Sequence, residues 1–169
     1  MKLNKTLRIT TICTVCAALI AVIFFYLPFI SVVDVTFHGM IITEDGTVLR
    51  QTTIELDGSV HNYLFKEDTV QLAFRTDDAD WRHCAKPATP YPSADPYIDV
   101  PYISTLTYVI SGDDSVRCCY AVSLVEGYFI AGYLDTPGKF LVGSTQENTE
   151  PETILAYFSQ WIDFYFPKQ

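Results

Sequence analysis

The chain has 169 residues, of which 49% are hydrophobic and 14% aromatic, and its formal net charge is −9. This apolar composition excludes a disordered protein, and the length suits one modest domain with a core of its own. All twenty acidic residues lie from Asp34 onward, whereas Lys2, Lys5 and Arg8 precede it without an acid. A strongly acidic body repels phosphate groups, so we expect no nucleic-acid partner.

The first element in chain order is an uncharged apolar segment, residues 9–33. Up to Leu27 it would form a helix of about 28 Å, which matches the roughly 30 Å hydrocarbon core of a bilayer. A cleaved signal usually has a shorter apolar stretch with small residues at the cut, and no such site follows this run. We therefore expect a retained transmembrane signal-anchor helix over residues 9–30, with cleavage and secretion as the alternative.

The distribution of basic residues predicts the orientation of this helix. Basic residues favour the cytoplasmic side of a membrane. Residues 1–8 are therefore expected to form a short cytoplasmic tail, and residues 31–169 an extracytoplasmic domain at the cell membrane. The small residues Cys13, Ala17 and Ala21 recur every four positions, a spacing that allows two membrane helices to approach closely. Ordinary usage of small residues explains the same spacing.

The domain after the helix is predicted to be mainly antiparallel β-structure. Apolar and polar residues alternate over residues 33–37, as in a half-buried strand. The Asp-Gly pairs at 45–46 and 57–58 predict hairpin turns, and a meander of four or five strands is expected up to Phe74. Three further strands and a short fourth are expected between residues 102 and 143, again with hairpin connections.

The C-terminus is predicted to be one amphipathic helix. Thr149 and Glu152 have the spacing of a capping box, and large apolar residues, including Trp161, follow at helical spacing. We expect this helix to dock on one face of the sheet and to end before Pro167. The predicted fold class is therefore α+β: a sandwich-like or curved antiparallel sheet of seven to eight strands with one C-terminal helix, preceded by the transmembrane helix.

A long proline-rich segment, residues 76–101, interrupts the strands. Its five prolines cannot donate ladder hydrogen bonds, and so long a loop in a compact domain is usually functional or disordered. Aromatic residues within it and at its end make it the candidate surface for binding another membrane or cell-surface protein, or a saccharide. These residues are Trp81, Tyr91, Tyr97 and Tyr102. Alternatively, the rings pack back onto the sheet and anchor the loop.

The same segment contains the densest group of possible metal ligands. They are Asp77, Asp78, Asp80 and His83, and carboxylates at this spacing suit a Ca²⁺ site. The calcium-loop pattern is incomplete, because Arg82 occupies a ligand position and no glycine follows. A solvated acidic loop is therefore the alternative, and no cofactor is expected.

Three cysteines lie in the expected extracytoplasmic domain. Cys118 and Cys119 are neighbours in a predicted strand, so their side chains face opposite sides of the sheet. We expect Cys118 to be buried and Cys119 to lie on the more exposed face. An extracytoplasmic location permits a disulfide bond between Cys119 and Cys84.

No established catalytic motif occurs in the chain. We therefore predict a single-pass membrane-anchored binding or assembly module of unknown ligand. One alternative is a hydrolase-type enzyme with a site near His83 and the adjacent carboxylates. The other is an accessory subunit of a membrane complex, which would associate with its partners through the transmembrane helix.

Overall fold

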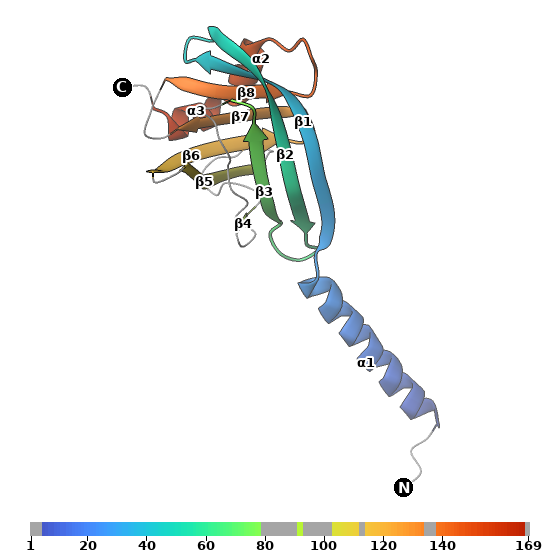
Figure 1. The fold of residues 1–169 in the computed structure, drawn as a ribbon. Helices are drawn as coiled ribbons and strands as arrows, with labels where there is room; N and C mark the ends of the chain where they lie inside the picture. Colours follow the sequence, from blue (N-terminus) through green and yellow to red (C-terminus); the bar gives the residue numbers. More distant parts are fainter. Residues whose placement is uncertain (1–4, 79–90, 93–102, 112–113, 134–137, 168–169) are drawn as a thin grey trace.

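The structure is a computed structural model that describes residues 5–78, 91–92, 103–111, 114–133 and 138–167 (Figure 1). An N-terminal helix is followed by eight strands and two short C-terminal helices. The elements are α1 (Lys5–Tyr26), β1 (Phe29–Thr43), β2 (Val48–Asn62), β3 (Thr69–Thr76), β4 (Tyr91–Pro92), β5 (Ile103–Ser111), β6 (Asp114–Ser123), β7 (Tyr128–Tyr133), β8 (Lys139–Ser144), α2 (Pro151–Tyr157) and α3 (Ser159–Tyr165).

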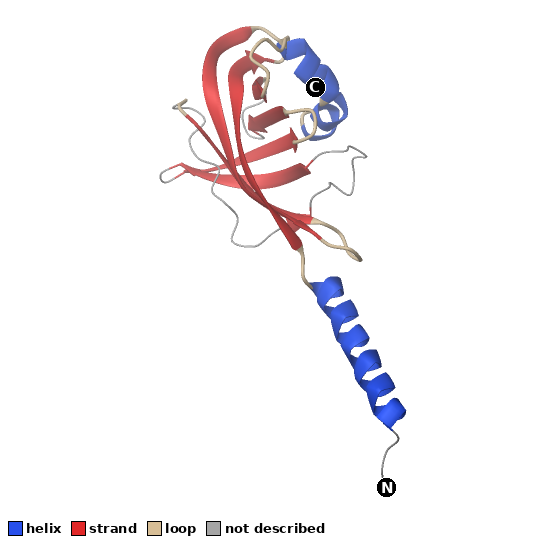
Figure 2. Ribbon diagram, turned by 90° about the vertical axis from the view of Figure 1, so that its right-hand side faces the viewer, coloured by secondary structure: helices blue, strands red, loops and turns tan. Residues whose placement is uncertain are grey.

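The described strands form one antiparallel sheet in the order β4-β3-β2-β1-β8-β7-β6-β5. This order consists of two meanders, one from β1 to β4 and one from β5 to β8. They are joined where His38–Thr43 of β1 pair with Lys139–Ser144 of β8. The sheet curves strongly, as Figure 2 shows. The predicted α+β class with a curved antiparallel sheet is therefore confirmed.

The larger core lies on the concave side of this sheet, where aromatic rings from the two meanders meet. The ring centroids of Phe37 and Phe129 lie 5.8 Å apart, and those of Phe74 and Tyr120 lie 5.4 Å apart. The Tyr120 hydroxyl donates a hydrogen bond of 3.3 Å to the carbonyl oxygen of Leu72. Since β6 and β3 are not neighbours in the sheet, these contacts hold the curvature by joining the two meanders across the core.

The second core lies on the opposite face of β6 to β8, beneath the C-terminal helices. Ile154, Phe158 and Trp161 are fully buried there. They pack against the sheet residues Ile42, Cys119, Ala121, Ile130, Phe140 and Val142. The predicted docking is confirmed, but the prediction of one continuous helix is wrong, because the helical segment consists of α2 and α3. It is divided at Phe158, whose backbone angles are φ −93° and ψ 17°, although the Phe158 N–H still donates to the Ile154 carbonyl at 3.1 Å.

The predicted turn at 57–58 is wrong, whereas that at 45–46 is confirmed. Gly46 has a φ of 85° and lies between β1 and β2. Gly58 instead lies within β2, with a φ of 150°, and is paired with Val33 and Leu72. A Cβ atom at Gly58 would lie 2.0 Å from the carbonyl oxygen of Gln71. The glycine therefore permits a close approach of β3, and one long strand replaces two predicted strands.

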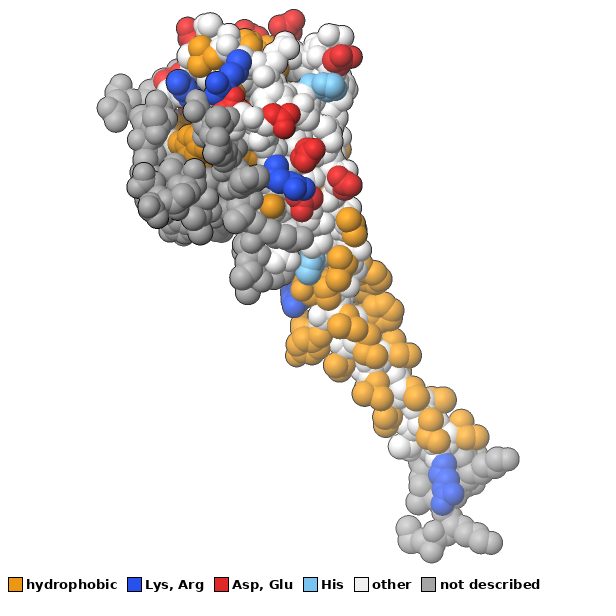
Figure 3. Space-filling view, in the orientation of Figure 1, with side chains coloured by type: hydrophobic (Ala, Val, Ile, Leu, Met, Phe, Trp, Pro, Cys, Tyr) orange, Lys and Arg blue, Asp and Glu red, His pale blue; other side chains and the backbone are white. Residues whose placement is uncertain are grey.

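Helix α1 extends away from the sheet and is exposed from Arg8 to Tyr26 (Figures 1 and 3). Within the described ranges, Arg8–Tyr26 is one helical stretch long and apolar enough to cross a membrane, and none of it is buried. This helix is compatible with a membrane anchor or with a signal sequence. Only Leu27 and Pro28 separate α1 from β1.

Candidate functional site

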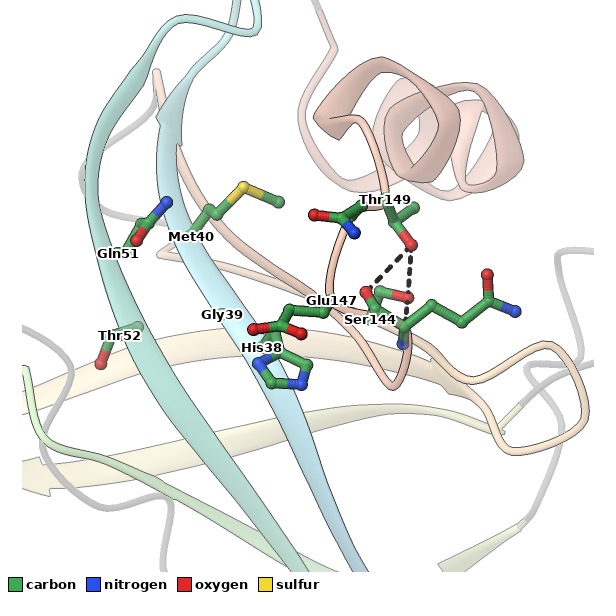
Figure 4. Close-up of a pocket in the computed structure, with 10 residues that line it drawn as sticks. His38, Gly39, Met40, Gln51, Thr52, Ser144, Glu147 and Thr149 are labelled. Atoms are coloured by element: carbon green, nitrogen blue, oxygen red, sulfur yellow. Dashed lines mark hydrogen bonds between the residues drawn. The ribbon is translucent and has the colours of Figure 1, made fainter.

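A polar pocket of about 280 Å³ lies on the outer face of β1 and β2, beside the connection from β8 to α2 (Figure 4). Three short segments that are distant in sequence line this pocket. They are His38, Gly39 and Met40 of β1, Gln51 and Thr52 of β2, and Ser144 with Gln146, Glu147, Asn148 and Thr149 of the connection. The pairing of β1 with both β2 and β8 brings these segments together.

Internal hydrogen bonds hold the connection that forms one wall of the pocket. Ser144 is buried, and its hydroxyl oxygen accepts a hydrogen bond from the Gln146 N–H at 3.0 Å. The Thr149 hydroxyl lies 2.8 Å from the same oxygen and 3.2 Å from the Gln146 carbonyl. The predicted capping box is therefore wrong. Glu150 is the N-cap residue of α2 and makes no side-chain cap, while Thr149 stabilises the loop instead.

The opposite wall of the pocket is the outward face of the sheet. His38 is exposed on β1, and Met40 lies two positions further along the same face, opposite Gln51 of β2. The Glu147 side chain and His38 both line the pocket (Figure 4). The pocket thus combines an imidazole, a carboxylate, three amides and a thioether, a set that favours binding of a small polar ligand through hydrogen bonds.

The Ser144 and Thr149 hydroxyls of this pocket belong to the hydrogen-bond network of the loop itself. A catalytic serine or threonine requires a base within hydrogen-bonding distance. Within the part of the chain that the structure describes, His38 forms no hydrogen bond to a hydroxyl or carboxylate. Ser144 and Thr149 contact each other and the loop backbone. Among the described side chains of the pocket, no hydroxyl is therefore hydrogen-bonded to His38 as a nucleophile is to its base.

Two of the predicted metal ligands, Asp77 and Asp78, lie within the described residues, and their side chains have different surroundings. Asp78 is buried, and its carboxylate forms a salt bridge with Arg50 of β2. Asp77 is exposed and lines a separate hollow of about 160 Å³ beside Arg75. The other two predicted ligands, Asp80 and His83, lie outside the described residues. Over the described ranges no three His, Cys, Asp or Glu side chains are grouped so that they could hold a metal ion.

Most of the predicted aromatic binding surface also lies outside the described residues, namely Trp81, Tyr97 and Tyr102. The backbone of Tyr91 belongs to the two-residue strand β4 and is paired with Val70 at the edge of the sheet. Part of the proline-rich segment is thus attached to β3. The role of its rings in binding stays a prediction.

Cys119 is fully buried, so the prediction of a more exposed face at this position is wrong. Its side chain lies in the core beneath α2 and α3, whereas Cys118 lies in the concave core. Both faces of β6 are covered because the helices occupy the side that the alternation pattern assigned to solvent. Cys84 lies outside the described residues, so its disulfide bond with Cys119 stays a prediction.

Sequence reasoning did not find the pocket, because its walls are separated by about a hundred residues and meet only through β1–β8 pairing. Together, the fold and the pocket define a curved-sheet α+β domain with a polar pocket, preceded by an apolar N-terminal helix. A comparison of the chain with protein-family models, curated proteins and solved structures found no match. The function is therefore inferred from the site itself.

Proposed function

We propose that this protein is a single-pass, membrane-anchored, extracytoplasmic binding module that holds a small polar ligand beside His38. One relationship carries the proposal: an exposed apolar helix of membrane-spanning length leads through two residues into a sheet whose outer face bears a polar pocket. A helix this apolar needs a lipid or protein environment, whereas the sheet domain has buried cores of its own.

The charge pattern supports the proposed side of the membrane. Lys5 and Arg8 are at the N-terminal end of α1, and all acidic residues follow the helix. The positive-inside preference then places the pocket outside the cytoplasm. Along β1, His38 lies about 30 Å from Phe29, at roughly 3.3 Å per residue, so a ligand can approach from solution without contacting the bilayer.

The residues around the pocket support a neutral or cationic ligand rather than an anionic one. Glu147 is the pocket's carboxylate, and the chain as a whole is acidic. Desolvation of an anion beside a carboxylate would be costly, whereas hydroxyl, amide or ammonium groups can pair with Gln51, Asn148 and Glu147. The volume suits a ligand about the size of one sugar ring or one amino acid, so a neutral saccharide unit remains a fitting ligand class.

Two measurements test this proposal. Membranes from cells that express the full chain should retain it through alkaline extraction, and protease added to intact cells should remove the domain. Ligand screening by NMR on the full chain in detergent micelles should give shifts at the pocket that Gln51→Ala and Glu147→Gln weaken at least several-fold. Gln160→Ala, at an exposed position on α3, is the matched control. Protease protection of the domain, or binding that is insensitive to both pocket variants, would contradict it.

A further inference from the structure

A patch of exposed apolar side chains surrounds the junction between α1 and the sheet. In the β2–β3 turn, Leu64 and Phe65 are 55% and 63% exposed. At the start of β1, Phe29, Ile30 and Val32 are 53%, 62% and 82% exposed. Isolated exposed apolar residues are common, but a contiguous patch at one end of a domain marks an interaction surface. Figure 3 shows this patch continuing from the apolar surface of α1.

Direct ring contacts connect the β2–β3 turn to the end of α1. The rings of Phe25 and Phe65 are stacked, with centroids 5.8 Å apart and planes inclined by 15°. Phe24 and Phe29 are also stacked, with centroids 6.2 Å apart. The turn therefore lies at the same level as the last residues of α1. A bilayer that surrounds those residues reaches the turn as well.

The turn has the composition and internal contacts of a segment at a membrane interface. The Tyr63 N–H donates a 2.7 Å hydrogen bond to Asp68 Oδ1, which closes the turn. The Lys66 ammonium lies 3.8 Å from the centroid of the Tyr63 ring. Leu64 and Phe65 lie between Tyr63 and Lys66 in the sequence, and both are exposed. Tyr and Lys are amphipathic side chains that suit the boundary between lipid and water, with apolar neighbours on the lipid side.

We propose that the β2–β3 turn inserts Leu64 and Phe65 into the interfacial region of the bilayer that α1 spans. This inference rests on the proposed anchoring role of α1 and adds a second membrane contact, which fixes the tilt of the sheet domain. The occupant is lipid because the patch is continuous with the lipid-facing surface of α1. Apolar area drives the insertion, since Lys66 is followed by Glu67 and Asp68 and the turn offers no net attraction for anionic lipids.

Depth-dependent fluorescence quenching on the full chain in phosphatidylcholine vesicles tests this contact. A genetically encoded environment-sensitive amino acid is placed at Phe65, at Phe24 of α1, or at Val125, which is 89% exposed in the β6–β7 turn. Lipids brominated near the headgroup end of the acyl chains should quench positions 65 and 24, but not 125. Quenching at 65 should change little between low and high salt. In the 65-labelled chain, Leu64→Asp should reduce quenching several-fold, whereas Leu124→Asp should leave it unchanged.

The outcomes separate this inference from the proposed anchor. Quenching at 24 together with a water-like, unquenched signal at 65 overturns the second contact and leaves the anchor intact. Absence of quenching at 24 overturns both proposals. Equal quenching at 65 and 125 also overturns the inference, because it indicates general adsorption of the domain. Both aspartate substitutions are at exposed positions, and unchanged melting of these variants in detergent will show that the domain remains folded.

Discussion

Gly39 of β1 and Gly143 of β8 are direct partners in the sheet, and the Ile54 side chain of β2 fills the space beside both. A Cβ atom at Gly39 would lie 2.8 Å from Ile54 Cγ1, and one at Gly143 would lie 2.8 Å from Ile54 Cδ1. Ile54 is fully buried in the concave core. The pair of glycines therefore allows β2 to pack closely over the junction of the two meanders, next to the pocket.

Gly143→Ala should lower the free energy of unfolding by about 1–3 kcal/mol, because the added methyl group overpacks the core. Ile54→Val removes Cδ1 and should partly rescue Gly143→Ala. It should rescue Gly39→Ala less, because Cγ1 remains in valine. Urea denaturation of the full chain in detergent, analysed as double-mutant cycles, measures both couplings. Equal rescue of the two glycine variants would contradict the packing described here.

Trp161 should contribute most of the docking energy of the C-terminal helices. It is fully buried, and its ring centroid lies 5.6 Å from that of Tyr165 and 5.4 Å from that of Phe166. Trp161→Ala should cost about 3–5 kcal/mol, as large aromatic truncations in cores do. Trp161→Phe should cost less, since Nε1 has no hydrogen-bond partner among the described residues. Thermal melting measures both, and Gln160→Ala on the same helix should change stability by less than about 0.5 kcal/mol.

The salt bridge between Arg50 and Asp78 should stabilise the folded domain by holding the residues that follow β3 against β2. The Asp78 side chain is 5% exposed and the Arg50 side chain 48% exposed, so removal of the arginine leaves a buried carboxylate without this partner. Arg50→Met should cost about 1–3 kcal/mol, less than a fully buried pair because solvent screens the arginine. The Arg50→Met/Asp78→Asn double variant should be more stable than the sum of the single effects predicts.

Arg75→Met is the matched control for that experiment. The Arg75 guanidinium lies 3.6 Å from Asp57 and 3.9 Å from Glu55, and all three side chains are largely exposed. Such pairs contribute about 0–1 kcal/mol. A loss for Arg75→Met as large as that for Arg50→Met would mean that burial of Asp78 does not determine the effect.

Asp45 in the β1–β2 turn should make the stability of the folded domain depend on pH in the acidic range. The hydrogen bond from the Thr43 hydroxyl, followed by that from the Thr47 N–H, lowers the pKa of Asp45 below its ordinary value. A carboxylate with a lowered pKa stabilises the folded state above the unfolded pKa of about 3.9, and this stabilisation is lost as the pH falls through the folded value.

The stability difference between wild type and Asp45→Asn should therefore be present at neutral pH and should shrink below about pH 4. Thr43→Val should raise the NMR titration midpoint of Asp45 toward the ordinary value, because the largest cause of its lowering is removed. A midpoint that Thr43→Val leaves unchanged would contradict the assigned cause.

Local patterns predicted those parts of the fold that local chemistry determines. Alternation over residues 33–37 identified β1, and the Asp45-Gly46 pair identified its turn, where Gly46 has a positive φ. The same reasoning failed at Gly58, because a glycine that permits close strand approach has the same sequence signature as one that permits a turn. Burial of Cys119 and the division of the helix at Phe158 depend on how the helices pack against the sheet.

The candidate site was harder to predict than the fold, because strand pairing assembles it. Nothing near His38 in sequence indicates that residues 146–149 lie beside it. The metal and aromatic predictions concentrated on the proline-rich segment, where unusual composition attracts attention. In the part of that segment that is described, a tertiary contact determines the surroundings of a predicted metal ligand, because Asp78 forms a salt bridge with Arg50 of β2.

The continuity of α1 with β1 has a mechanical consequence. β1 extends from Phe29 to Thr43 and is paired with β2 over most of that length. If α1 is the proposed membrane anchor, a pull on a ligand held beside His38 would load the sheet along β1 and reach the bilayer through α1. Because antiparallel ladder bonds lie perpendicular to the strands, such a load shears many of them together and does not open them one by one. In the proposed role, the domain would therefore resist tension between a bound ligand and the bilayer while remaining folded.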